Sequence, residues 1–137
     1  MRARFLAIAI SALAALSLVV AGCGEDDGEP TGGVVRGDTL TIYSSMPLQG
    51  DSRRQSEDVV AGERLALEEV GGKVGDRRIR FVSLDDATPE ARKWDPGQVS
   101  INAHKAAQDP TTIAYVGEFN SGASAVSIPI LNQEGIL

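Results

Sequence analysis

The hydrophobic positions of this chain follow two different patterns. An apolar run fills residues 5–20 behind Arg2 and Arg4, and a glycine-rich acidic stretch with no apolar periodicity follows at 24–38. From Thr39 onward, short β-branched segments alternate with longer stretches in which apolar residues recur every three, four or seven positions. The first pattern is typical of an export signal, and the second predicts strands that alternate with amphipathic helices.

Three segments that are rich in β-branched and aromatic residues predict strands: 39–43, 78–84 and 112–117. Three segments with helical apolar periodicity predict helices: 52–70, 96–108 and 121–131. Asp95 is predicted to cap the second helix with Pro96 at its first position, and Gly135 to close the third. The alternation predicts an α/β fold, in which a parallel sheet has helices on both faces and right-handed crossovers.

The first predicted helix has recognisable ends and an apolar face. Asp51 or Ser52 is expected to cap its first turn, and Gly71-Gly72 to end it. The face expected to contact the sheet consists of Val59, Val60, Gly62, Ala66, Leu67 and Val70. Gly62 is expected to let the helix and the sheet approach each other closely.

Cys23, the only cysteine, directly follows the apolar run in the tetrapeptide Val20-Ala21-Gly22-Cys23. The run is shorter than the roughly 20 apolar residues of a spanning helix, and small residues are typical of a cleavage site. This arrangement resembles the lipobox of bacterial lipoproteins, in which the cysteine is acylated and becomes the new N-terminus. It implies a signal peptide at 1–22, a flexible tether at 23–38 and a folded part at 39–137. An uncleaved membrane anchor and a free structural cysteine are the alternatives.

Composition and motifs argue against several functions. With a formal net charge of −6, one Trp, two Tyr and no basic cluster, the chain is a poor nucleic-acid binder. Ser121 lacks the flanking glycines of a nucleophile elbow, and His104, the only histidine, is placed on a solvated helix face. The glycines at 71–75 follow a helix and so do not form a phosphate loop. We therefore expect no enzyme activity, cofactor or metal site, a secreted hydrolase being the weakest alternative.

Ligands of open parallel sheets bind at the carboxyl ends of the strands. Three segments are predicted to lie there: 44–51, 85–88 and 118–124. The third runs into a helix start, where free amides bind carboxylates or phosphates, and Ser121 and Ser124 add hydroxyl groups. Ser121 could also be only the N-cap of its helix. Because adjacent carboxylates on a strand point to opposite sides, one of Asp85-Asp86 is expected to hold a loop or a cap rather than a cation.

Several blocks of sequence, in order behind the signal, resemble the branched-chain amino acid-binding group of type I solute-binding proteins of ABC importers. The blocks are Pro47-Leu48-Gln49-Gly50, Gly62 with Arg64-Leu65-Ala66-Leu67-Glu68-Glu69, Leu84-Asp85-Asp86-Ala87, Tyr115-Val116-Gly117, Asn120-Ser121-Gly122-Ala123-Ser124 and Pro129-Ile130-Leu131-Asn132-Gln133-Glu134-Gly135-Ile136. The resemblance covers 39–137 and implies the first part of lobe one of a two-lobed periplasmic-binding-protein fold. It implies an N-terminal piece of a longer chain, with a genuinely short protein as the alternative.

The resemblance also implies a site and a function. The Ser121 hydroxyl and nearby helix-start amides would hold a ligand carboxylate, in a site made of Asn120, Ser121, Gly122, Ala123 and Ser124. A tyrosine of the family's pocket falls on Gln55, a departure that leaves branched-chain specificity open. The implied function is capture of an amino acid or related small polar solute for ABC permease subunits, by a protein held through lipid on Cys23 at the outer face of the cell membrane. The sensing domain of a signalling receptor is the alternative.

Overall fold

The computed structural model describes residues 37–137, so the predicted signal peptide, Cys23 and the tether up to residue 36 lie outside the described residues. The elements, in chain order, are β1 (Thr39–Met46), the 3-10 turn η1 (Gly50–Ser52), α1 (Arg53–Glu69), β2 (Lys73–Val74), β3 (Arg77–Asp85), α2 (Pro96–Ala107), β4 (Thr112–Val116) and α3 (Ser121–Gln133). All three predicted strands and all three predicted helices are therefore confirmed, although β1 continues three residues further than expected.

The sheet has the strand order β2-β3-β1-β4. β1 lies between β3 and β4 and runs parallel to both, as predicted. The sequence analysis did not predict the two-residue strand β2, which pairs antiparallel with β3 at the edge of the sheet. Gly75 has a φ of 58° in the turn between these strands, a conformation that glycine adopts without steric penalty and that lets the chain reverse.

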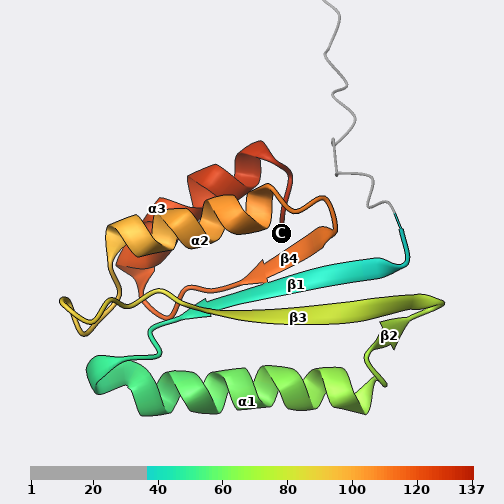
Figure 1. The fold of residues 1–137 in the computed structure, drawn as a ribbon, viewed down its shortest axis with the longest axis horizontal. Coiled ribbons are helices and arrows are strands. Elements are labelled where there is room, and N and C mark those ends of the chain that lie inside the picture. Colours follow the sequence, from blue (N-terminus) through green and yellow to red (C-terminus); the bar gives the residue numbers. More distant parts are fainter. Residues whose placement is uncertain (1–36) are drawn as a thin grey trace, which may run out of the picture.

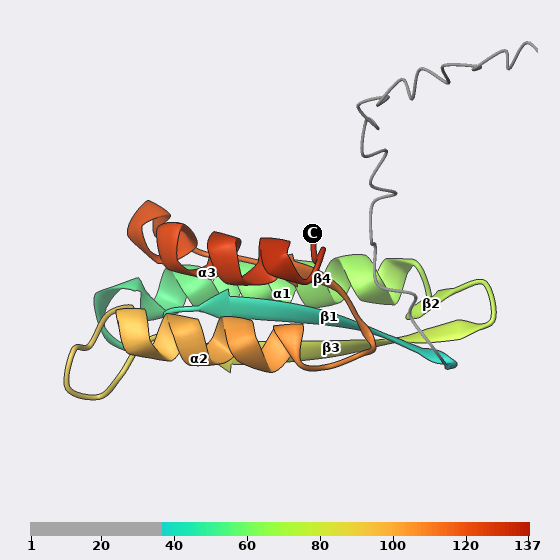
Figure 2. The same cartoon turned by 90° about the horizontal axis from the view of Figure 1, so that it is seen from above.

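Helices cover both faces of the sheet, as predicted: α1 lies on one face, and α2 and α3 lie on the other (Figures 1 and 2). The buried core is between the sheet and the α2–α3 pair, and it consists of Tyr43, Ala103, Ala106, Tyr115 and Leu131. Val82, Leu84, Ile130 and Ile136 pack against it. The main hydrophobic core therefore lies on the face of the sheet that α2 and α3 cover.

The orientation of α1 differs from the prediction. Ser56 and Val60 are its buried residues, whereas Val59 and Val70 are 38% and 61% exposed. Gly62 is exposed, and a Cβ there would meet nothing within 4 Å, so the expected close approach to the sheet was wrong. Only part of the apolar surface of α1 is therefore buried against the sheet. An open apolar groove of about 370 Å³ remains, lined by Ile42, Glu63, Ala66, Leu67, Val70, Phe81 and Val116.

The helix ends follow local chemistry. The Asp95 side chain accepts a hydrogen bond from the Gln98 amide (3.0 Å) and caps α2, as predicted. Gly71 and Gly72, with φ of 72° and 62°, end α1, as predicted. Ser52 is the N-cap of α1, which confirms one of the two predicted positions, but the expected side-chain cap bond does not form. Asp51 and Ser52 lie in η1, which runs straight into α1.

Asp109 ties the end of α2 to the sheet, near the amino ends of the strands. Its carboxylate accepts hydrogen bonds from the Thr111 amide (2.9 Å) and hydroxyl (2.7 Å), from the Tyr43 hydroxyl (2.9 Å) and from the Arg80 guanidinium. Burial acts to raise the pKa of Asp109, but the Thr111 and Tyr43 hydrogen bonds and the Arg80 charge outweigh it and lower that pKa below 3.8.

Candidate ligand-binding site

Three loops gather at the edge where the parallel strands end. They follow β1, β3 and β4, and all three helices begin at the same edge (Figure 1). Gly50, in the first loop, has a φ of 71°, and a Cβ there would lie 1.7 Å from the Arg92 carbonyl oxygen of the second loop. The first two loops are therefore packed backbone to backbone, at a distance that only glycine permits.

Asp85, the last residue of β3, joins these two loops. Its Oδ1 accepts from the Leu48 amide (2.8 Å) and the Ala87 amide (2.9 Å), and its Oδ2 accepts from Gln49 Nε2 (2.7 Å). This confirms that one acid of the Asp85-Asp86 pair holds a loop. Hydrogen bonds to a charged acceptor are among the stronger ones in proteins, so the edge is held in a defined shape before any ligand arrives.

The third segment presents the start of α3. The N-cap is Asn120, so the alternative in which Ser121 caps the helix was wrong. The Asn120 carbonyl accepts from the amides of Ala123 (2.9 Å) and Ser124 (3.1 Å). Ser121 and Gly122 are exposed, and the Ser121 hydroxyl has no hydrogen bond to another described residue. The hydroxyl of Ser121 and the two amides that begin the helix can therefore reach a ligand.

The other predicted site residues are less favourably placed. The Ala123 side chain is buried, and the Ser124 hydroxyl lies 3.5 Å from the Asn120 carbonyl, at the limit of a hydrogen bond. Gln55 is exposed in the first turn of α1. Because α1 and α3 cover opposite faces (Figure 1), Gln55 and Ser121 share the edge of the sheet but not a face.

Sequence reasoning did not assign Trp94 to the site. A Cβ on Gly122 would lie 2.8 Å from Cζ2 of Trp94, so the indole packs directly on the first turn of α3. The backbone holds the ring there, because Trp94 forms an antiparallel bridge with Ala87. The signal was available in the sequence: a single tryptophan in a polar loop between two predicted ligand-edge segments.

The same edge contains a pair of acids that the sequence analysis also did not join. Asp86 is fully buried, and burial first, then the hydrogen bond and charge of Glu118, raise its pKa to about 8. The Tyr115 hydroxyl donates to Glu118 Oε1 at 2.9 Å. Among residues 37–137 there is no group of three His, Cys, Asp or Glu side chains placed to hold a metal ion.

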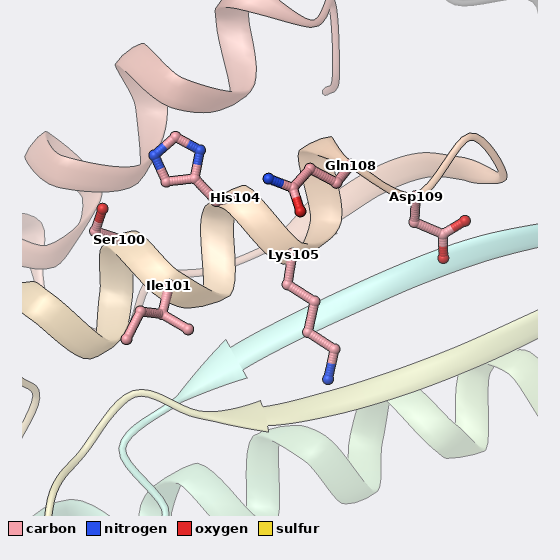
Figure 3. Close-up of a pocket in the computed structure, with 6 residues that line it drawn as sticks. All are labelled: Ser100, Ile101, His104, Lys105, Gln108 and Asp109. Carbon is pink, nitrogen blue, oxygen red and sulfur yellow. The ribbon is translucent and has the colours of Figure 1, made fainter.

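A larger hollow, of about 610 Å³, lies along α2 (Figure 3). Its lining residues are Ser100, Ile101, His104, Lys105, Gln108 and Asp109. All six belong to one helix and the turn after it, so the hollow is a shallow surface and not a meeting point of several elements. His104 is exposed on it, as predicted. The loops at the carboxyl edge are the better candidate for a ligand site.

Searches with family models and among curated proteins gave no match to this chain. Solved structures do match. A solute-binding protein of an ABC transporter from R. palustris, in complex with benzoate, is 26% identical with a TM-score of 0.60, over 72% of this chain and 26% of its own length. A leucine-binding protein from Thermotoga maritima is 22% identical with a TM-score of 0.59, over 69% and 25%. The described residues have the fold of part of one lobe of a type I solute-binding protein.

The resemblance seen in the sequence is confirmed at the level of the fold. A third solute-binding protein, the branched-chain amino acid transporter protein LivJ from Streptococcus pneumoniae in complex with isoleucine, is 19% identical with a TM-score of 0.60, over 72% of this chain and 27% of its own. This chain thus spans about a quarter of the length of each of these three solute-binding proteins. None of the helices in residues 37–137 has the length and apolar character to cross a membrane.

Proposed function

We propose that this chain is the substrate-binding component of an ABC importer, and that it captures an amino acid or a related small carboxylate for the permease subunits. The observation that carries the proposal is the exposed start of α3 at the carboxyl edge of the sheet. Its N-cap Asn120 makes no side-chain cap bond, and the Ser121 hydroxyl is unengaged by other described residues. A helix start with free amides favours a negatively charged group.

Two structural neighbours support a carboxylate as the group bound there. One was solved with benzoate and another with isoleucine, which differ in shape and in charge but share a carboxylate. In the proposed complex the Ser121 hydroxyl and the amides of Ser121 and Gly122 donate to that carboxylate. Trp94 and Gln55 stand at the same edge with an aromatic ring and an amide, and they are candidates for contacts to the rest of the ligand.

The proposal includes the cellular location of the protein. Cys23 would carry the lipid, and residues 23–38 would tether the folded part at the outer face of the membrane. Binding without chemical conversion is the proposed activity, since neither Ser121 nor Ser124 has a hydrogen bond from its hydroxyl to a basic side chain among the described residues. Radiolabelled palmitate incorporation that is lost in Cys23→Ser would support the anchor, and equal labelling of both would refute it.

Replacing Ser121 by alanine tests the site. A hydrogen bond to a charged group contributes roughly 1.5–3 kcal/mol, so Ser121→Ala should weaken binding of isoleucine or benzoate about tenfold or more. Ser100→Ala, on the outer side of α2, serves as the matched control and should bind like the wild type. Titration calorimetry on the complete protein measures both. Unchanged affinity in Ser121→Ala would remove Ser121 from the site, and the absence of binding to any small carboxylate would remove the proposed function.

A further inference from the structure

Asp86 is an acid buried where no donor reaches it. The residue is 0% exposed, and neither carboxylate oxygen accepts a hydrogen bond from an N–H or O–H group of residues 37–137. Its backbone is fixed on both sides, because its amide donates to the Met46 carbonyl (3.1 Å) and its carbonyl accepts from the Asp95 amide (2.8 Å). A charged carboxylate in such a place is strongly disfavoured, and a group held there takes up a proton instead.

The group that acts most strongly on Asp86, after burial, is a second carboxyl, that of Glu118, whose hydrogen bond and charge both raise the pKa of Asp86. The Tyr115 hydroxyl donates to Glu118 Oε1 (2.9 Å), which leaves Glu118 Oε2 buried without a hydroxyl or amide donor among the described residues. An ionised carboxylate only accepts hydrogen bonds, so two carboxyl groups can bond to each other only when one carries a proton. The like charge of Glu118 also opposes ionisation of Asp86.

The neighbouring groups also favour the protonated form of Asp86. Asp85 adds a negative charge from β3, and Tyr115, from β4, has a pKa raised by burial and by the charges of Glu118 and Asp86. From α2, the neutral amide of Asn102 donates to the Asp85 carbonyl (2.9 Å). Burial, followed by the hydrogen bond and charge of Glu118, raises the pKa of Asp86 to about 8.

A proton fits the pair better than a metal ion does. The oxygens left without a donor are both oxygens of Asp86 and one of Glu118. Ca²⁺ takes about six to eight oxygen ligands, and no cluster of three metal-ligating side chains occurs in the described part of the chain. One proton shared by the two carboxyl groups would give these buried oxygens a donor without a metal ion.

We propose that Asp86 and Glu118 hold one proton between them, and that this proton fastens the β3–α2 loop to the segment from which α3 begins. Glu118 stands three positions before Ser121, and Asp86 directly follows Asp85, which ties the first loop. Loss of the proton leaves two buried like charges at the edge where the loops meet, and their repulsion loosens it. The pair holds its proton whether or not the proposed function is correct, because no ligand takes part.

The sign of the pH dependence follows from the two states of Asp86. Its pKa is about 8 in the folded chain and has the ordinary value of 3.8 once the chain unfolds. Between these values the folded chain holds a proton that the unfolded chain has released, so stability falls as pH rises and levels off above about pH 8. Asp86→Asn mimics the protonated acid and can donate to Glu118, and Glu118→Gln does the same from the other side.

Urea unfolding of the full chain from pH 5 to pH 9.5 tests this pair. The midpoints of Asp86→Asn and Glu118→Gln should exceed that of the wild type by an amount that grows up to about pH 8 and stays constant above it. Glu90→Gln removes an exposed acid from the same loop and should parallel the wild type. Carboxyl-carbon NMR of the wild type needs no variant, and one side-chain carboxyl should titrate near pH 8. Profiles of Asp86→Asn and wild type that run parallel, or carboxyls that all titrate below pH 6, would overturn the proposal.

Discussion

Replacement of Asp85 by alanine should loosen the carboxyl edge of the sheet and destabilise the chain. The side chain accepts hydrogen bonds from the Leu48 amide (2.8 Å), the Ala87 amide (2.9 Å) and Gln49 Nε2 (2.7 Å). These bonds connect the loop after β1 to the loop after β3. Alanine removes all three at once and puts nothing in their place.

The magnitude depends on which donors can find water. Ala87 is 4% exposed, so its amide would remain buried without a partner, at a cost of about 1–3 kcal/mol. Leu48 and Gln49 are only half-buried, and their donors can turn to solvent and recover most of their loss. We therefore expect Asp85→Ala to lower the free energy of unfolding by about 2–4 kcal/mol. Asp85→Asn keeps an acceptor for the two amides but turns an NH₂ group toward Gln49, so we expect it to lower the free energy of unfolding by about 1 kcal/mol.

Urea unfolding at pH 7, followed by circular dichroism, measures these differences. Asp58→Ala removes an exposed acid from α1 and should change the free energy of unfolding by less than about 0.5 kcal/mol. An Asp85→Ala variant as stable as this control would refute the assignment of Asp85 as the tie between the loops. If Asp85→Asn lowers the free energy of unfolding as much as Asp85→Ala, the negative charge of Asp85 stabilises the loops more than its hydrogen-bond acceptors do.

Two further variants test other contacts. Asp109→Asn should be less stable than the wild type at pH 7. The difference in the free energy of unfolding should shrink as pH falls through the lowered pKa of Asp109, because the wild type then loses the same charge. A difference that stays constant down to pH 2 in urea unfolding would contradict the proposed hydrogen-bond network of Asp109. Gly122→Ala places a Cβ where the ring of Trp94 lies, 2.8 Å from Cζ2, and should push the ring toward solvent. Since Trp94 is the only tryptophan, its emission should move to longer wavelength, and an unchanged spectrum would count against the contact.

Periodicity predicted the strands and helices because each repeats one pattern over many residues. It could not predict β2, which has only two residues and forms through a glycine turn. It also misjudged α1, where the apolar positions cover a wide arc and the helix presents only part of it, with Ser56 and Val60 buried and Gly62 exposed. Asn120 and Ser121 are both good caps, so sequence alone could not choose between them.

The candidate site divides in the same way. The helix start at Ser121 and the loop-holding role at Asp85-Asp86 have local signals, a polar run after a strand and paired acids at a strand end. The proposed pairing of Asp86 with Glu118 has none, since the two acids follow different strands, β3 and β4, which lie on either side of β1. The position of Trp94 over Gly122 likewise depends on how the β3–α2 loop folds back.

The way this loop is closed at its base makes it a place to build a sensor. The Asp95 amide donates to the Asp86 carbonyl (2.8 Å), and Ala87 bridges to Trp94, so the two ends of the loop meet before it leaves the sheet. Pro89 and Glu90, at its far end, are exposed. A fluorescent reporter domain inserted between them would enter and leave through a closed neck, at low entropic cost to the strands. The inserted domain would also lie at the same edge as the proposed ligand contacts, where ligand binding can change its fluorescence.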